Sequence, residues 1–180
     1  MNRFVEPLGV SLPAGAYRLR PTSIEDCDGI TAAGQEPSIG GRMPWFPHPF
    51  LPGYAKPWVE RAISSWADGQ HWVLSILDEG EQYAGSVAFS DVKPPSGLKG
   101  DTLEIGYWVL STHRNRGVAT QAATAAMAWA SEALRPDHFW AKALLDNTAS
   151  HRVLEKSGYA PDGGDERFRW FVRPPDPREG

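Results

Sequence analysis

One stretch near the middle of the chain constrains the fold most, because its character changes from strand to helix within a few residues. Leu103 to Leu110 is dense in β-branched and aromatic residues, which predicts a strand. Gly117 opens an alanine-rich run to Leu134, which predicts a helix. The polar segment between them, 111–116, holds two arginines. This arrangement predicts an anion site, because the first amides of a helix have no internal partner and the helix dipole favours negative charge there.

The rest of the chain predicts alternating strands and helices. Before the central stretch, the patterns predict a strand at 17–20, helices at 24–33 and 57–67, and strands at 72–77 and 82–90. After it, they predict a strand at 138–144, a helix that Asp146 or Asn147 caps and that runs to Ser157, and a last strand at 167–172. The resulting order, β-α-α-β-β-β-α-β-α-β, predicts an α/β sandwich with a mixed sheet.

Length, charge and cysteine content narrow the class of protein. A chain of 180 residues is one domain's worth, with 1–14 as a loose arm, 15–173 as the domain and 174–180 as a tail. The net charge of −4 gives no electrostatic case for nucleic acid or a membrane surface. No apolar run approaches the roughly 20 residues of a transmembrane helix. Cys27 is alone, which excludes an internal disulfide and fits a reducing cytoplasm.

Two ordered motifs resemble one enzyme family. The run Arg114-Asn115-Arg116-Gly117-Val118-Ala119 matches the R/Q-x-x-G-x-G/A signature of the GNAT acetyltransferase superfamily, and Glu104 to Val109 looks like the fourth strand of its RimJ/RimL-type branch. Asn147 to Tyr159 resembles the N-x-x-S-x-x-x-x-E-K-x-G-F/Y segment of that branch. The resemblance covers residues 15–173. One departure is Gln121, where many relatives have Glu; it removes a carboxylate at the helix start and leaves the amides in place.

The resemblance implies both a fold and a co-substrate. The fold would be a GNAT-like sandwich whose central sheet is mixed and mostly antiparallel, flanked by helices, with a splayed strand pair holding acetyl-CoA. The pyrophosphate would meet the backbone amides of Arg116, Gly117, Val118, Ala119 and Thr120, with added charge from Arg114 and Arg116. The pantetheine arm and the thioester carbonyl would meet the strand backbone at Trp108, Val109 and Leu110. Asn147 would contact the same arm, with Ser150 near the sulfur.

Acetyl transfer to an amine also needs a base and a proton for the departing thiolate. Glu104 is the only carboxylate inside the central strand, and relatives often place a base on this strand. The alternative for Glu104 is an outward-facing edge charge or an ion pair with an arginine. Ser150 is the favoured proton donor and Tyr159 the competing one. No metal is expected, because no ligand spacing is seen among His48, His113, His138 and His151.

The acceptor side is predicted from one unusual loop. Residues 34–57 form a long connection that contains an apolar, proline-rich run, Met43 to Phe50. We expect Trp45, Phe46 and His48 to wall the acceptor site, with core packing as the alternative. The acceptor would be a protein N-terminal α-amine or a small amine, and the enzyme a monomer or a homodimer. The competing function is a non-catalytic acyl-CoA-binding or interaction module on the same fold.

Overall fold

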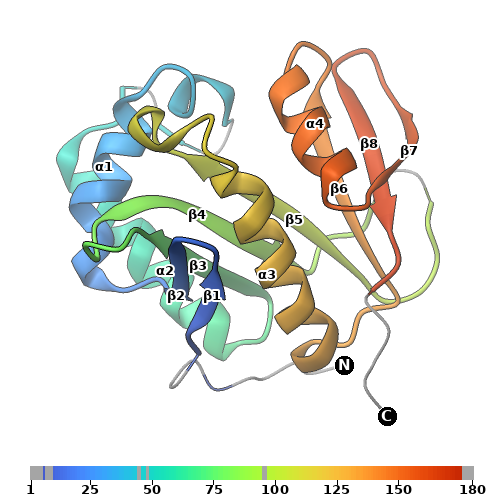
Figure 1. Cartoon of the computed structure of the whole chain (residues 1–180), viewed down its shortest axis with the longest axis horizontal. Helices are drawn as coiled ribbons and strands as arrows, with labels where there is room; N and C mark the ends of the chain where they lie inside the picture. The colour runs from blue at the N-terminus through green and yellow to red at the C-terminus, as the bar shows by residue number, and fades with distance from the viewer. Residues whose placement is uncertain (1–5, 7–9, 44–45, 48, 95–96, 176–180) are drawn as a thin grey trace.

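A single sheet organises the molecule. The structure, a computed structural model, describes residues 6, 10–43, 46–47, 49–94 and 97–175 (Figure 1). Eight strands are ordered β1-β2-β3-β4-β5-β6-β8-β7. Their bounds are β1 Leu12–Ala14, β2 Tyr17–Pro21, β3 His71–Leu77, β4 Tyr83–Ser90, β5 Thr102–Val109, β6 His138–Leu144, β7 Ala160–Gly164 and β8 Phe168–Arg173. The predicted mixed, mostly antiparallel sheet is confirmed, since among the described strands only β5 and β6 run parallel.

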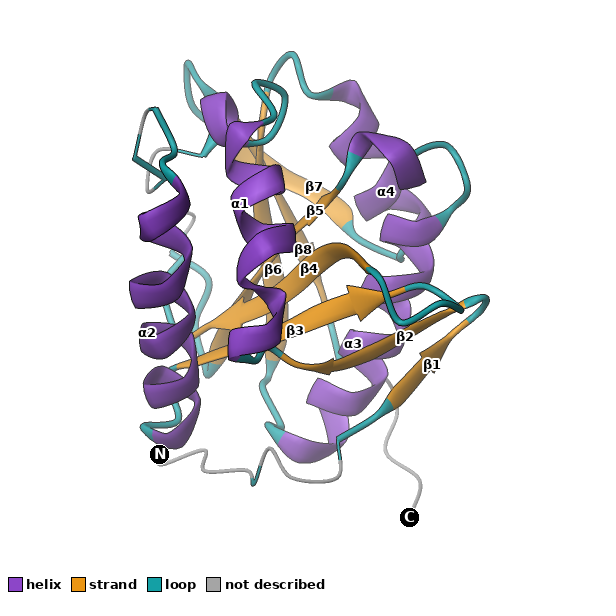
Figure 2. Cartoon of the chain, turned by 90° about the vertical axis from the view of Figure 1, so that its left-hand side faces the viewer, coloured by secondary structure: helices purple, strands orange, loops and turns teal. Residues whose placement is uncertain are grey.

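Helices cover both faces of this sheet. Helices α1 (Cys27–Gln35) and α2 (Ala55–Ala67) lie on one face, and α3 (Val118–Ala133) and α4 (Thr148–Lys156) lie on the other (Figure 2). In the described residues, four short 3-10 helices join the elements: η1 Ile24–Asp26, η2 Gly40–Arg42, η3 Pro52–Tyr54 and η4 Ser111–His113. No helix in the described part of the chain is both apolar enough and long enough to cross a bilayer.

The structure contains two strands that the sequence did not predict. Leu12–Ala14 form β1, which pairs antiparallel with β2, so the prediction of a loose arm over 1–14 is wrong for these three residues. The turn that joins them is possible because Gly15 has a φ of 66°. Ala160–Gly164 form β7, an exposed edge strand paired with β8. Both strands are short and contain Pro or Gly, which weakens a strand pattern in the sequence.

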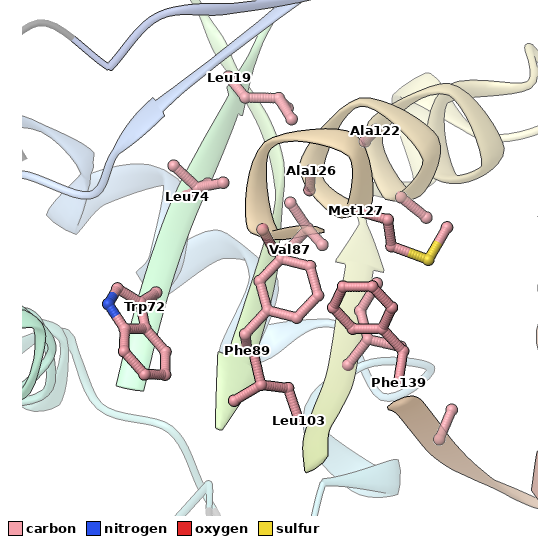
Figure 3. Packing of buried hydrophobic residues seen from close by; sticks show 14 of the residues in the cluster. Leu19, Trp72, Leu74, Val87, Phe89, Leu103, Ala122, Ala126, Met127 and Phe139 are labelled. Atoms are coloured by element: carbon pink, nitrogen blue, oxygen red, sulfur yellow. The ribbon is translucent and has the colours of Figure 1, made fainter. Parts of the chain in front are cut away.

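The main hydrophobic core lies between α3 and the sheet. Figure 3 shows Ala122, Ala126 and Met127 of α3 above large side chains of the strands. All three residues are buried, as are Val87 of β4 and Phe139 of β6 beneath them. The alanines let the helix approach the sheet closely, and the short connection 110–117 brings the start of α3 near the end of β5. A second buried cluster lies on the other face, between α1, α2 and the sheet.

Candidate functional site

The parallel strands β5 and β6 separate soon after they begin. Their pairing runs only from Thr102↔His138 to Glu104↔Trp140. Beyond that point, β5 stays paired with β4 up to Val109, and β6 stays paired with β8 up to Leu144. The two strands therefore diverge, as Figure 1 shows toward the top of the view. The predicted splay is present, and it leaves one edge of β5 without a neighbouring strand.

Only part of the predicted backbone site on β5 faces this free edge. The Leu110 amide donates to the Ala84 carbonyl on β4, at 2.9 Å. In an antiparallel pair, successive residues turn their backbone groups to opposite sides, so Trp108 also faces β4, whereas Tyr107 and Val109 face the splay. The prediction that Trp108 and Leu110 offer backbone groups there is therefore corrected, and Val109 remains. The Trp108 side chain is buried on the α1–α2 face.

The loop before α3 leaves the start of the helix uncovered. Gly117 is the N-cap residue, with φ 76° and ψ 3°, and no side chain caps the helix. A Cβ atom at Gly117 would meet only the Gln121 amide nitrogen, at 3.4 Å, within the described part of the chain. The positive φ explains the glycine, and the missing cap leaves the amides of residues 118–120 available to a ligand. This geometry suits an anion at the helix start.

The two arginines of this loop have different surroundings. The Arg114 guanidinium donates to the Val109 carbonyl at 2.9 Å, to Ser38 Oγ at 3.0 Å and to Glu36 Oε2 at 2.8 Å. Its charge is therefore already matched by a carboxylate, and it fastens the loop instead of offering a free cation. Arg116 is exposed to solvent. Of the two predicted phosphate-binding arginines, Arg116 is the better placed.

Glu36 is a site residue that the sequence did not suggest. It lies just after α1, where its Oε1 accepts hydrogen bonds from the amide and the hydroxyl of Ser111, at 2.9 and 3.0 Å. Its Oε2 binds Arg114. One carboxylate thus joins the beginning of the α1–α2 loop to the loop that precedes α3. An acid at the end of a predicted helix gives no signal of such a contact.

A second ion pair joins the same α1–α2 loop to the far side of the splay. Arg42, in η2, makes two hydrogen bonds to the carboxylate of Asp146, at 3.1 and 3.2 Å. Asp146 follows β6 and precedes α4. We call residues 36–42 the strap, because its first residue is tied beyond the end of β5 and its last residue beyond the end of β6. The strap therefore spans the open end of the splay.

Ser150 and Asn147 lie where the second motif predicts, at the start of α4. The Asn147 side chain accepts a hydrogen bond from the Ser150 amide at 3.3 Å, so Asn147 is the helix cap. The Ser150 hydroxyl lies 2.9 Å from the hydroxyl of Tyr107 on β5. Burial raises the pKa of Tyr107 to about 12, against the opposing effect of the Ser150 hydrogen bond. Tyr107 was not predicted as a site residue, because an aromatic residue in a strand usually means core.

Tyr159, the competing proton donor, is placed differently. Its side chain is 4% exposed and belongs to the main core cluster beneath α3. Gly158 before it has a φ of 84° and ends α4 with the left-handed turn that the sequence predicts. The turn directs Tyr159 into the core. Burial therefore disfavours Tyr159 and favours Ser150 as the group near the sulfur.

Glu104 lies at the base of the splay, on the α1–α2 face. Its carboxylate is 3.2 Å from Lys142 Nζ on β6, and its side chain is 18% exposed. The alternative of an ion pair is therefore realised, but the partner is Lys142 and not the expected arginine. The pair does not exclude a role as base, since a carboxylate must be ionised before it can accept a proton. Within the described residues, no three His, Cys, Asp or Glu side chains gather as a metal site.

The predicted acceptor wall is only partly described. Phe46 is 2% exposed, and its ring centroid lies 5.1 Å from the ring centroid of Phe50 and 5.5 Å from that of Trp108. Phe46 is therefore a core residue of the α1–α2 face and not the wall of an open cleft, which corrects that prediction. Trp45 and His48 lie outside the described residues. The burial of Phe46 and Phe50 explains part of the apolar character of this loop.

Comparisons with known proteins point to one family. The family model Acetyltransferase (GNAT) domain matches residues 17–160. Ribosomal-protein-serine acetyltransferase of Escherichia coli (strain K12) is 26% identical over 90 residues, which is 50% of this chain and 48% of that protein. The chain therefore matches about half the length of this curated relative.

Solved structures share the fold over nearly the whole chain. Ribosomal-protein-S5-alanine acetyltransferase from Vibrio fischeri superposes with a TM-score of 0.77 at 18% identity, covering 93% of this chain and 97% of that one. RimL, a ribosomal L7/L12 alpha-N-protein acetyltransferase in complex with coenzyme A, superposes with a TM-score of 0.79 at 16% identity, covering 93% and 99%. The fold, the two motifs and the family match over residues 17–160 lead to one conclusion: this chain belongs to the GNAT acetyltransferase family.

Proposed function

We propose that this chain transfers the acetyl group of acetyl-CoA to a primary amine, by direct attack of the amine within a ternary complex. The observation that carries the proposal is the splay of β5 from β6 beside the uncapped start of α3. An uncapped helix start suits a pyrophosphate, and the free edge of a strand suits an amide-bearing arm such as pantetheine. The complex of the structural relative RimL with coenzyme A supports acetyl-CoA as the donor.

Donor binding would rest mainly on backbone groups. The amides of residues 118–120 would meet the pyrophosphate, with Arg116 nearby. Val109 would offer its amide to the arm or to the thioester carbonyl, because the Arg114 guanidinium already binds its carbonyl. Arg114 would hold this arrangement in place through Glu36. A donor site of this kind tolerates changes of side chain better than changes of backbone geometry.

Acetyl transfer would then use two side chains in different steps. Glu104 would take a proton from the ammonium form of the acceptor, directly or through water, because a protonated amine cannot attack. Ser150 would give a proton to the thiolate as the carbon–sulfur bond breaks. The two groups come from opposite sides of the sheet, since Glu104 faces α1 and α2 whereas Ser150 starts α4. The acceptor and the donor would therefore approach the splay from different faces.

The acceptor class that we favour is the N-terminal α-amine of a protein. The relatives named above are ribosomal-protein acetyltransferases, and RimL is an alpha-N-protein acetyltransferase. An α-amine has a reference pKa of about 8, against about 10.4 for a lysine amine, so it asks less of the base. Because coenzyme A is found in the cytoplasm and Cys27 has no second cysteine in the chain, we assign the activity to that compartment.

An acceptor panel with acetyl-CoA tests this function. The panel would contain peptides with a free serine or alanine N-terminus, the same peptides blocked at the α-amine but carrying a lysine, and polyamines and free amino acids. We expect thiol release with the free α-amines and a singly acetylated product by mass spectrometry. If the protein binds coenzyme A and no amine accelerates thiol release, it is a non-catalytic acyl-CoA-binding module. Release with small amines alone would move the acceptor class to small molecules.

A further inference from the structure

One hydrogen bond crosses from β5 to the start of α4 and therefore joins the two sides of the splay. Tyr107 lies in the part of β5 that has no β6 neighbour, and Ser150 lies in the first turn of α4, which follows β6. Their hydroxyl oxygens are 2.9 Å apart. The Tyr107 hydroxyl is also 3.2 Å from the Ser150 carbonyl oxygen. Ser150, which we assign as the proton donor, is thus held by a tyrosine of β5, on the other side of the splay.

The number of protons in this pair decides what Ser150 can do. Each hydroxyl carries one proton. If Tyr107 donates to the carbonyl, the serine proton turns to the tyrosine oxygen and is used. If Tyr107 donates to Ser150 Oγ, the serine proton is free to point at another acceptor. Only the second arrangement makes Ser150 a proton donor for sulfur.

The second arrangement has the shorter contact, since the Tyr107 hydroxyl is 2.9 Å from Ser150 Oγ and 3.2 Å from the Ser150 carbonyl oxygen, and the surroundings hold both residues in place. Asn147 holds the Ser150 amide at 3.3 Å, which fixes the backbone of the serine. Burial raises the pKa of Tyr107 to about 12, so this tyrosine keeps its proton at neutral pH and remains a donor. Tyr159, the other tyrosine of this region, lies in the core and is 4% exposed.

We propose that Tyr107 is the positioning residue of the proton donor: its hydroxyl donates to Ser150 Oγ and leaves the serine proton for the departing thiolate. This proposal rests on the acetyl transfer proposed above. When the carbon–sulfur bond breaks, its electron pair goes to sulfur, and sulfur takes the proton of Ser150 Oγ. The serine oxygen regains a proton along the hydrogen bond from Tyr107, and solvent returns one to the phenol. The amine loses the proton that balances the thiol, so the sum is amine plus thioester giving amide plus thiol.

Steady-state kinetics of four variants test the proposal. Tyr107→Phe keeps the ring and its packing and removes only the hydroxyl. We expect it to lower kcat roughly tenfold, while the KM for acetyl-CoA and the affinity for coenzyme A stay unchanged. Ser150→Ala should lower kcat at least as much, and the double variant Tyr107→Phe/Ser150→Ala should be no slower than Ser150→Ala alone. Ser64→Ala, at an exposed serine of α2 outside the segments assigned to the site, is the control and should keep the wild-type rate.

A second readout separates positioning from a merely structural role. With an acetyl thioester of a more acidic thiol, the thiolate leaves without a proton, so the loss caused by Tyr107→Phe should shrink. Additive losses in the double variant would overturn the proposal, as would a full-rate Tyr107→Phe or a loss that acidic thiols do not reduce. If the wild type turns over and Ser150→Ala does so at the wild-type rate, only this proposal fails. If no amine promotes thiol release in the wild type, the proposed function fails with it.

Discussion

Two segments flank the splay, and they are held in opposite ways. The donor loop, residues 114–120, ends in a helix start with no side-chain cap and a glycine at positive φ. The strap, residues 36–42, is fixed by charged side chains at both ends, through Glu36 and Arg42. The donor loop therefore offers backbone to a ligand, whereas the strap uses its side chains to hold its own place. This difference supports the proposed division of roles, in which backbone groups bind acetyl-CoA and side chains shape the acceptor side.

The largest effect is expected for Glu104→Gln, which tests whether chemistry on the acceptor face depends on a side chain. General-base catalysis contributes about 10²–10⁴-fold, so kcat should fall by roughly that factor. Affinity for coenzyme A, measured by calorimetry, should stay close to wild type because the donor loop is unchanged. The rate should partly recover at high pH, where the amine is already deprotonated.

Lys142→Met provides the control for this prediction. It removes the partner of Glu104, at 3.2 Å, and leaves the carboxylate itself. If Glu104 served only the ion pair, the two variants would be equally impaired. A Glu104→Gln enzyme that keeps the acidic limb of the wild-type pH–rate profile would show that another group is the base.

The next largest effect concerns stability and tests the buried side chains of the connection 34–57. Phe46→Ala should lower the free energy of unfolding by about 3–5 kcal/mol, because it empties a buried aromatic site. Urea denaturation measures this change. Leu51→Ala, at a side chain 49% exposed in the same loop, should change stability by less than about 0.5 kcal/mol. A stable Phe46→Ala protein with a raised acceptor KM would return Phe46 to the wall of the acceptor site.

The same contrast explains how much of the site could be predicted from the sequence. The donor loop depends on local features, a glycine and an uncapped helix start, so its position was expected from the residues. The splay was expected only because the family resemblance implies it. The strap depends on Glu36 meeting Arg114 and on Arg42 meeting Asp146, pairs that are 78 and 104 residues apart. No local pattern announces such pairs. Arg114 was for this reason assigned to phosphate, although the fold gives it to a carboxylate.

The face of a strand residue could be predicted only in part, for a related reason. The alternation of β5 separates Tyr107 from Trp108, but the pattern alone does not say which face meets the donor. Tyr107 was missed because its partner, Ser150, comes from an element 43 residues later. Phe46 was assigned to the acceptor site because an apolar loop that walls a cleft and one that packs into the core have the same composition. The roles of Tyr107 and Phe46 depend on which distant elements pack against them, and residue type alone does not reveal this.

A smaller effect is expected for the donor loop itself, where the effect of an added charge on coenzyme A affinity can be separated from that of backbone strain. Gly117→Asp places a carboxylate and a Cβ atom at a positive φ, so affinity for coenzyme A should fall at least tenfold, about 1.4 kcal/mol, by calorimetry. Gly117→Ala introduces the backbone strain without the charge, so its affinity for coenzyme A should fall less than that of Gly117→Asp. Gly41→Asp adds the same charge to the strap, where a Cβ atom would meet nothing within 4 Å in the described structure, and should leave the affinity unchanged. Equal losses at both glycines would remove the distinction between the two segments.

The smallest effect is expected at the outer end of the strap. The side chains of Arg42 and Asp146 are 40% and 71% exposed, so water and salt screen their attraction. A double-mutant cycle with Arg42→Ala and Asp146→Ala, followed by urea denaturation, should give a coupling free energy of about 0.2–1 kcal/mol that fades at high salt. Glu36 and Arg114 at the inner end are 23% and 35% exposed, and Glu36 also serves two donors of Ser111, so Glu36→Gln should cost more than Arg42→Ala. The strap would then be firmly tied on the donor side and weakly tied toward α4, so its outer end is the one that can open for an acceptor. If the Arg42–Asp146 coupling free energy were independent of salt and larger than that of Glu36 with Arg114, the outer end would be the more firmly tied one.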